Sequence, residues 1–82
     1  MYTIDWKEHA LHDVEKLETS IATRIIKKIE TLSKDPFSQD IKRLKGSNDF
    51  RLRIGDYRVI FFIEKNLITI LKVGHRKHIY DR

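Results

Sequence analysis

Residues 50–61 decide the fold and read Phe50-Arg51-Leu52-Arg53-Ile54-Gly55-Asp56-Tyr57-Arg58-Val59-Ile60-Phe61. Apolar and charged side chains alternate before the Gly-Asp pair, as in a strand with one buried face. The Gly-Asp pair suits the two-residue turn of a tight hairpin, and a strongly β-prone run follows it. We therefore predict a β-hairpin that pairs Arg53 with Arg58 and Leu52 with Val59.

A second hairpin is predicted directly after the first. Residues 65–66, Lys-Asn, would form its two-residue turn, and residues 67–73 would form a strand that ends where Gly74 breaks the run. A regular hairpin with this turn would place Val73 opposite Arg58. The chain would then leave the sheet beside the two paired arginines.

The first forty residues predict a short strand and two helices. Tyr2, Ile4 and Trp6 alternate with polar residues, as in a half-buried strand. Apolar residues then recur at helical spacing in two segments, with Asp5 and Thr19-Ser20 as the expected N-terminal caps. The second helix is expected over residues 21–34, ended by Asp35-Pro36. The two stripes consist of Ala10, Val14 and Leu17 in the first helix and Ala22, Ile25, Ile29 and Leu32 in the second.

These elements predict an α+β fold, in which the N-terminal strand and an antiparallel helix hairpin join a mostly antiparallel sheet. The helices would cover the sheet face that carries Phe50, Leu52, Val59, Phe61 and Ile63. The chain of 82 residues is long enough for one core, so a single domain spanning residues 1–82 is expected.

Composition excludes several classes of protein. The chain has no cysteine, so it can form neither disulfides nor a thiolate zinc site. The longest apolar run, residues 59–63, is far shorter than the ~20 residues of a membrane-spanning helix. Charged residues at positions 5, 7 and 8 occupy the place where a secretory peptide would be apolar. We therefore expect a cytoplasmic protein without a membrane partner.

Positive charge is concentrated in the second half of the chain. Residues 1–40 hold six Lys/Arg against eight Asp/Glu, whereas residues 41–82 hold eleven against four. Such a field attracts polyanions and favours nucleic acid or an acidic protein segment as the partner.

The predicted hairpin places arginines on the face opposite the helices. Arg53 and Arg58 would lie directly across from one another with Arg51 on the same face, and like charges in such positions are destabilising. An anionic ligand would explain the arrangement. Alternatively, the guanidinium groups extend into water or pair with one of three carboxylates, which are Asp49, Asp56 and Glu64.

Cleavage of RNA by its own 2′-hydroxyl needs a base, positive charge around the developing oxyanions and an acid for the leaving 5′-oxygen. Arginine can grip phosphate with two parallel hydrogen bonds but holds its proton too tightly to act as a base. Proton transfer is left to His75, His78 or Tyr80. The carboxylates of the basic half are scattered, and we expect no metal site.

Three segments resemble the signature of RelE toxins within the RelE/ParE superfamily: Leu44-Lys45-Gly46, residues 51–61 and Val73-Gly74-His75-Arg76. The helix pair and first strand fit as well. The resemblance implies a microbial-ribonuclease-like fold and a RelB-like antitoxin that wraps and neutralises the toxin. It also implies cofactor-free, metal-independent cleavage of messenger RNA in the ribosomal A site.

The resemblance also implies roles for individual residues. Arg58 and Arg76 match arginines that bind and activate the scissile phosphate, and Tyr80 resembles a C-terminal catalytic tyrosine at a slightly shorter spacing. Arg51 and Arg53 stand where the best-known members have lysines, one of them a proposed proton-transfer group; this shifts proton transfer toward Tyr80 or a histidine. The expected catalytic set is Arg53, Arg58, Arg76 and Tyr80. The expected RNA-binding set is Lys42, Arg43, Lys45, Arg51, His75, Lys77 and His78.

Two other functions fit most of the same residues. ParE relatives share the helix hairpin and the Gly-Asp-Tyr-Arg turn, yet act by binding DNA gyrase. A complete polar set on one face, here Arg53, Arg58, Arg76 and Tyr80, favours the RNA-cleaving class. A non-catalytic nucleic-acid-binding module is the third possibility, and the lack of an aromatic stripe on the face that carries the arginines disfavours it.

Overall fold

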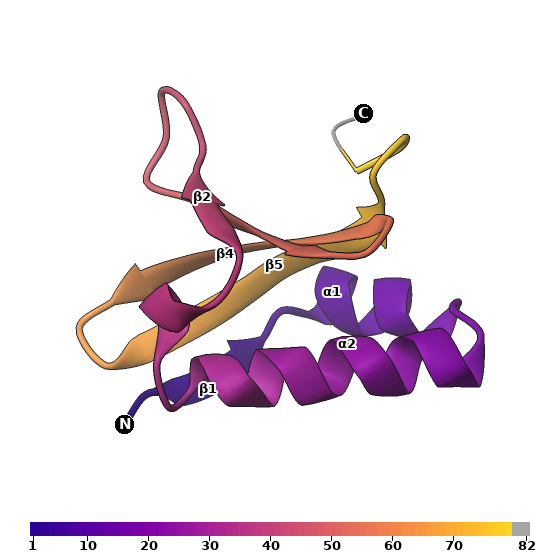
Figure 1. The fold of residues 1–82 in the computed structure, drawn as a ribbon, viewed down its shortest axis with the longest axis horizontal. Coiled ribbons are helices and arrows are strands. Elements are labelled where there is room, and N and C mark those ends of the chain that lie inside the picture. Colours follow the sequence, from indigo (N-terminus) through magenta and orange to yellow (C-terminus); the bar gives the residue numbers. More distant parts are fainter. Residues whose placement is uncertain (80–82) are drawn as a thin grey trace.

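The computed structural model describes residues 1–79, which form five strands, two α-helices and a short 3₁₀ helix (Figure 1). In chain order these are β1 (Thr3–Trp6), α1 (Glu8–Glu15), α2 (Thr19–Leu32), η1 (Pro36–Ser38), β2 (Ile41–Arg43), β3 (Phe50–Ile54), β4 (Tyr57–Glu64) and β5 (Leu67–His75). No helix among residues 1–79 is long and apolar enough to cross a membrane.

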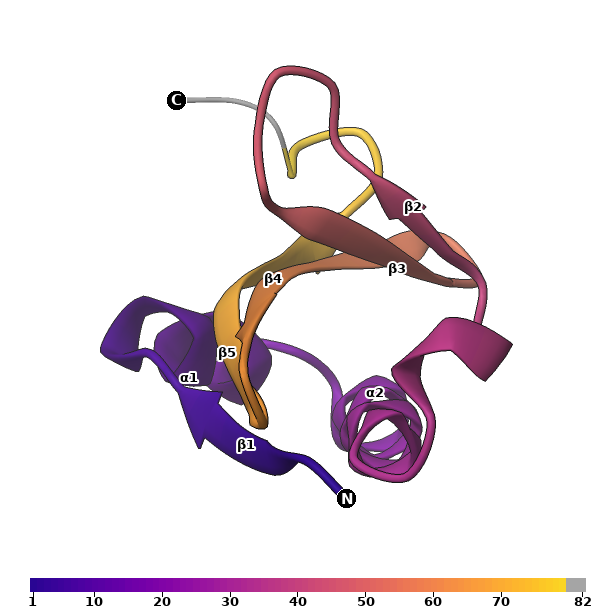
Figure 2. The ribbon, with the colours of Figure 1, turned by 90° about the vertical axis from the view of Figure 1, so that its left-hand side faces the viewer.

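The strands form one sheet in the order β1-β5-β4-β3-β2. Three neighbouring pairs are antiparallel, and only β1 and β5 are parallel. Both helices lie on one face of this sheet, whereas the β2–β3 connection and the C-terminal segment rise from the other (Figures 1 and 2). The predicted α+β fold is confirmed.

The core fills the space between the helices and the sheet. The predicted hairpin register is confirmed, since Arg53 pairs with Arg58 and Leu52 with Val59. The buried side chains of this core are Ala10, Val14, Ile25, Ile29, Leu32, Leu52, Ile54, Val59, Phe61, Ile68, Ile70 and Val73.

Several boundaries differ from the sequence prediction. Asp5 does not cap α1 because it lies inside β1, paired with Thr69, and the N-cap residue is Lys7. Helix α2 begins at Thr19 and ends at Leu32, two residues earlier at each end than expected. The strand β2 was not predicted; its three residues are too few to establish an alternating pattern.

The register of β4 and β5 contains a β-bulge that contradicts one prediction. Phe61 pairs with Ile70 but Ile60 pairs with Lys72, so Leu71 has no partner and every later residue is displaced by one. Arg58 therefore lies opposite Gly74 and not opposite Val73. A regular hairpin would have turned Lys72 toward the core and Val73 away from it, because a one-residue slip exchanges the two faces of a strand.

A carboxylate from α1 supports β5 beside this bulge. Strand β1 stops at Trp6, opposite Ile70, and leaves the following edge of β5 without a strand partner. The Oδ2 atom of Asp13, whose side chain is 17% exposed, accepts a 2.9 Å hydrogen bond from the backbone N–H of Val73. Helix α1 thus supplies a hydrogen-bond acceptor for β5 beyond the end of β1.

Candidate functional site

The sheet face opposite the helices gathers cations from three strands. We call it the arginine face and define it by the outward residues of β3, β4 and β5. Their register forms two rows across the sheet, one of Arg53, Arg58 and Gly74 and one of Arg51, Ile60 and Lys72. None of the six residues in these two rows is acidic. An anion that lies between the rows therefore has cations on both sides.

The guanidinium group of Arg58 is held by the hairpin turn. Its Nη1 atom donates to the carbonyl oxygens of Gly55 at 2.8 Å and of Tyr57 at 2.9 Å. An arginine has five N–H donors, and these two bonds leave Nε and Nη2, the edge that can grip a phosphate with two parallel bonds. The turn therefore fixes the side chain without using its phosphate-binding edge.

Arg76 is brought to the same turn by Asp56. The backbone N–H of Arg76 donates to the carbonyl oxygen of Asp56 at 2.7 Å, and its Nε lies 3.6 Å from Oδ1 of that residue. Both side chains are more than half exposed, and an exposed pair of this kind contributes only about 0–1 kcal/mol. An arriving phosphate can therefore take the place of the carboxylate.

Arg53 forms two hydrogen bonds with one residue, Asp40, where β3 continues past the end of β2. Its Nε donates to Oδ2 of Asp40 at 2.7 Å, and its backbone N–H donates to the carbonyl oxygen of the same residue. The sequence suggested three other carboxylates for this pairing, Asp49, Asp56 and Glu64. Asp40 was missed because it precedes the unpredicted strand β2 and only that strand places it beside β3.

Arg51 is partly buried, and its Nε has no hydrogen-bond acceptor among the described residues. Across the sheet it pairs with Lys42 on β2 and with Ile60 on β4. A buried donor without an acceptor costs about 1–3 kcal/mol, so an acceptor from water or ligand is expected there.

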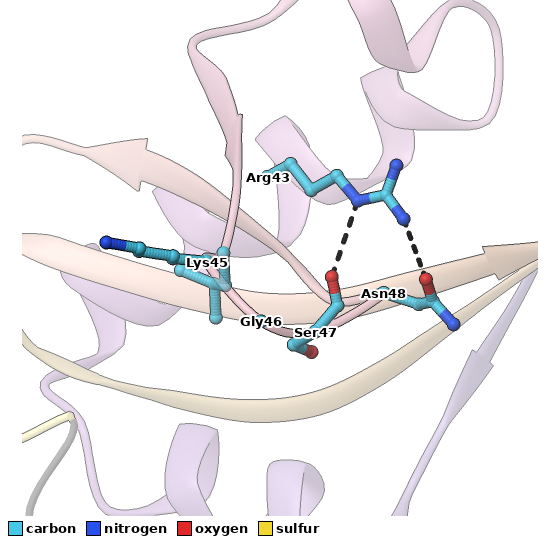
Figure 3. A pocket seen from close by; sticks show the side chains of 6 residues that line it. Arg43, Lys45, Gly46, Ser47 and Asn48 are labelled. Atoms are coloured by element: carbon cyan, nitrogen blue, oxygen red, sulfur yellow. Dashed lines mark hydrogen bonds between the residues drawn. The ribbon is translucent and has the colours of Figure 1, made fainter.

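Two predicted cations, Arg43 and Lys45, lie at the end of β2 and in the connection that follows it. Arg43 donates from Nε to the carbonyl oxygen of Ser47 at 3.3 Å and from Nη2 to Oδ1 of Asn48 at 2.7 Å, as Figure 3 shows. These bonds use the side chain of Arg43 to close its own loop. Lys45 points away from that pair of bonds and leaves its ammonium group exposed (Figure 3).

Two of the predicted tail residues, His75 and His78, lie close to one another. His75 shares the helix side of β5 with Val73, and its ring packs edge-on against Tyr57 at 5.4 Å between centroids. Its Nδ1 accepts the backbone N–H of Lys77 at 3.1 Å, so its neutral ring carries the proton on Nε2. The ring of His78 lies 6.2 Å from it. The predicted catalytic residue Tyr80 lies outside the described residues.

Ile79 anchors the tail to the arginine face and was missed by the sequence analysis. It is 3% exposed, and a Cβ atom on Gly74 would lie 3.2 Å from its Cδ1. Because position 74 has no side chain, Ile79 can pack directly against the backbone of β5. The sequence signal was a single apolar residue within a run of charged ones, which is too weak to separate an anchor from a frayed end.

The described residues contain no group of three or more His, Asp or Glu side chains that could hold a metal ion. The arrangement of residues 51–79 suits electrostatic binding of a phosphate by neighbouring guanidinium groups.

Comparison with known proteins decides the family. The model of the ParE toxin family of type II toxin–antitoxin systems matches residues 4–80. The chain belongs to this family. Toxin RelE3 of Methanocaldococcus jannaschii is 44% identical over 43 residues, a segment that spans 51% of this chain and 49% of that relative.

Solved structures place the chain among RelE toxins. The toxin–antitoxin complex RelBE2 from Mycobacterium tuberculosis contains a chain with a TM-score of 0.82 and 29% identity, over 92% of this chain and 98% of that one. The archaeal RelE–RelB complex from Pyrococcus horikoshii OT3 gives a TM-score of 0.80 and 25% identity, over 94% and 97%. The protein is therefore a RelE-type toxin, as the residues around the first hairpin predicted.

Proposed function

We propose that this toxin is a metal-independent endoribonuclease that cleaves messenger RNA in the ribosomal A site and so inhibits translation in the cytoplasm. The observation that carries the proposal is the guanidinium of Arg58, held by two backbone carbonyls with its phosphate-binding edge left open. Arg76 stands beside it at the same turn, bonded to Asp56. Two guanidinium groups at one turn suit a phosphate that gains charge in the transition state.

The proposed reaction is attack of the ribose 2′-oxygen on the adjacent phosphorus. The bond from phosphorus to the 5′-oxygen breaks, which yields a 2′,3′-cyclic phosphate and a 5′-hydroxyl. Arg58 and Arg76 stabilise the equatorial oxygens, and Arg51 and Arg53 hold the flanking backbone. Proton transfer is assigned to the tail, to His78 or Tyr80, since His75 faces Tyr57 and already binds the backbone of Lys77.

The remaining predicted cations would position the RNA. Lys42 and Arg43 on β2, Lys45 in the β2–β3 connection and Lys77 in the tail would surround the arginine face with charge that contacts phosphates without reading bases. The ribosome would supply the alignment of 2′-oxygen, phosphorus and leaving oxygen, an orientation effect that can contribute several kcal/mol.

An antitoxin is the proposed protein partner. The M. tuberculosis and P. horikoshii relatives were solved as toxin–antitoxin complexes. A RelB-like partner of this toxin would lay an acidic or amphipathic segment over the basic second half of the chain.

Gyrase binding is the second candidate function, because the matching family model is described for ParE toxins. A gyrase-binding toxin needs a surface complementary to gyrase but no set of groups around a scissile phosphate. The two activities leave different products, which makes them separable in one preparation.

The deciding experiment is translation on purified ribosomes with added toxin, followed by mapping of messenger-RNA ends. Cuts in the A site with 2′,3′-cyclic phosphate ends are expected, and they should persist when cobalt hexammine replaces magnesium on intact ribosomes. Intact RNA together with gyrase-linked DNA breaks would favour the ParE activity. Strict magnesium dependence with 5′-phosphate products would require a metal mechanism, and efficient cutting of naked RNA would remove the ribosomal requirement.

A further inference from the structure

The β-bulge in β5 brings an amine to the arginine face. Because Leu71 is unpaired, Lys72 lies opposite Ile60 and shares its face with Arg51 and Arg58. A regular register would have paired Lys72 with Val59 and turned it toward the helices. Lys72 was absent from the predicted site for this reason.

Lys72 lies close to Arg58, the residue proposed to bind the scissile phosphate. Arg58 pairs with Gly74, two residues further along β5, so that Arg58 and Lys72 are diagonal neighbours across one pair of strands. Cβ atoms in such positions are about 7–8 Å apart or somewhat closer, which long side chains can bridge. One phosphate between the two side chains can contact both.

Lys72 has no acidic partner among residues 1–79. Its side chain is partly buried, and among the described residues it makes no ion pair with a carboxylate. Its row contains Arg51, whose buried Nε also has no acceptor. Two donors of the same row thus remain for an external acceptor, and both can be satisfied by successive oxygens of one phosphodiester backbone.

We propose that Lys72 is a substrate-binding residue of this site, whose ammonium group contacts the RNA phosphodiester next to Arg58. This assignment rests on the proposed RNA-directed function. The bulge at Leu71 is the structural device that supplies this charge, in two rows where the cations of β3 and β4 are guanidinium groups.

The test compares three variants with the intact toxin. Lys72→Met removes the charge and keeps most of the stem, Lys72→Arg restores a charge, and Lys28→Met removes one charge from the exposed side of α2 as a matched control. Two quantities are measured for each: cleavage on ribosomes, and binding of a 2′-O-methyl RNA oligonucleotide across a salt series. Thermal unfolding checks that each variant folds.

We expect Lys72→Met to lower cleavage by about 10–100-fold, the value for one lost hydrogen bond to a charged group. The slope of log affinity against log salt should fall by about 0.7, corresponding to one phosphate contact with a single strand. Lys72→Arg should recover most of both losses, and Lys28→Met should change neither.

The outcomes separate this inference from the proposed function. If the intact toxin cleaves and Lys72→Met matches Lys28→Met in cleavage and in salt slope, Lys72 is not a substrate contact and the nuclease proposal stands. If the intact toxin does not cleave, the salt slope decides alone: a smaller slope for Lys72→Met supports the contact, and an equal slope overturns it.

Discussion

The guanidinium group of Arg58 closes a turn through one nitrogen atom and keeps its other two nitrogen atoms for a ligand. The two carbonyl acceptors use only Nη1. A lysine at this position would keep the charge but could not hold the turn and grip a phosphate in the same fixed geometry. Arginine at position 58 therefore suits both the turn and an anion beside it.

Removal of either arginine beside the turn should abolish most activity without unfolding the protein. Arg58→Ala and Arg76→Ala should each lower ribosomal cleavage by ~10²–10³-fold, because each removes a donor aimed at transition-state charge. Rates are measured by single-turnover cleavage, and circular dichroism checks the fold. Lys28→Ala is the control for loss of one positive charge. Near-normal rates in folded Arg58→Ala and Arg76→Ala proteins would reject the proposed site.

At the scale of elements, the contact between α1 and β5 determines how the sheet is held next to its bulge. The carboxylate of Asp13 replaces a strand partner for the N–H of Val73. His9, one helical turn earlier, lies 3.6 Å from the same carboxylate but is 69% exposed. Removal of Asp13 should therefore lower the free energy of unfolding much more than removal of His9.

Asp13→Ala should lower the free energy of unfolding by about 1–3 kcal/mol, because it leaves the N–H of Val73 without an acceptor. His9→Ala should change it by less than about 0.5 kcal/mol, as expected of an exposed residue. Urea denaturation of both variants measures the difference. Equal midpoints would show that the hydrogen bond contributes nothing to stability.

The elements also show how far sequence reasoning reached. The first hairpin was predictable to the residue because Gly55-Asp56 and the alternation on both sides fix its register. The second hairpin was predicted correctly only as far as Phe61 and Ile70, since nothing local distinguishes Leu71 as an extra residue. The consequences followed along the chain: Lys72 was overlooked and the partner of Arg58 was wrong by one position.

The site was predictable where it depends on local pattern and not where it depends on long-range contacts. Arg53 and Arg58 were placed together by the turn between them. Asp40 reaches Arg53 through the unpredicted strand β2, and Ile79 reaches Gly74 through the path of the tail. Such contacts join residues whose relation is set by tertiary packing.

The whole molecule has two faces of different character. One face of the sheet is covered by α1 and α2, and the other carries the cations of β3, β4 and β5 between the β2–β3 connection and the tail (Figure 2). Residues 41–82 contain eleven Lys/Arg and only four acidic residues. A partner that neutralises the toxin by covering the arginine face must therefore meet a strong positive field.

Association with the antitoxin should slow markedly as salt is raised. The field of the basic half steers an acidic segment at low ionic strength, and the Debye length falls from ~10 Å at 0.1 M to ~3 Å at 1 M salt. Stopped-flow mixing of the separated toxin and antitoxin measures the association rate. The same series with sucrose in place of salt controls for viscosity and exclusion effects. A rate independent of salt, or a complex that leaves residues 51–79 exposed, would contradict this picture.

Strand β5 is one residue longer than its partner requires, and this has an evolutionary consequence. Loss of Leu71 alone would leave Phe61 opposite Ile70 and Ile60 opposite Lys72, so a deletion there preserves every cross-strand pair. An insertion one step later, after Lys72, would turn Val73 out of the core and carry the tail to the helix side. Length changes in this strand therefore differ in effect by position, and a lineage can lose the arrangement of the arginine face without substituting any residue on it.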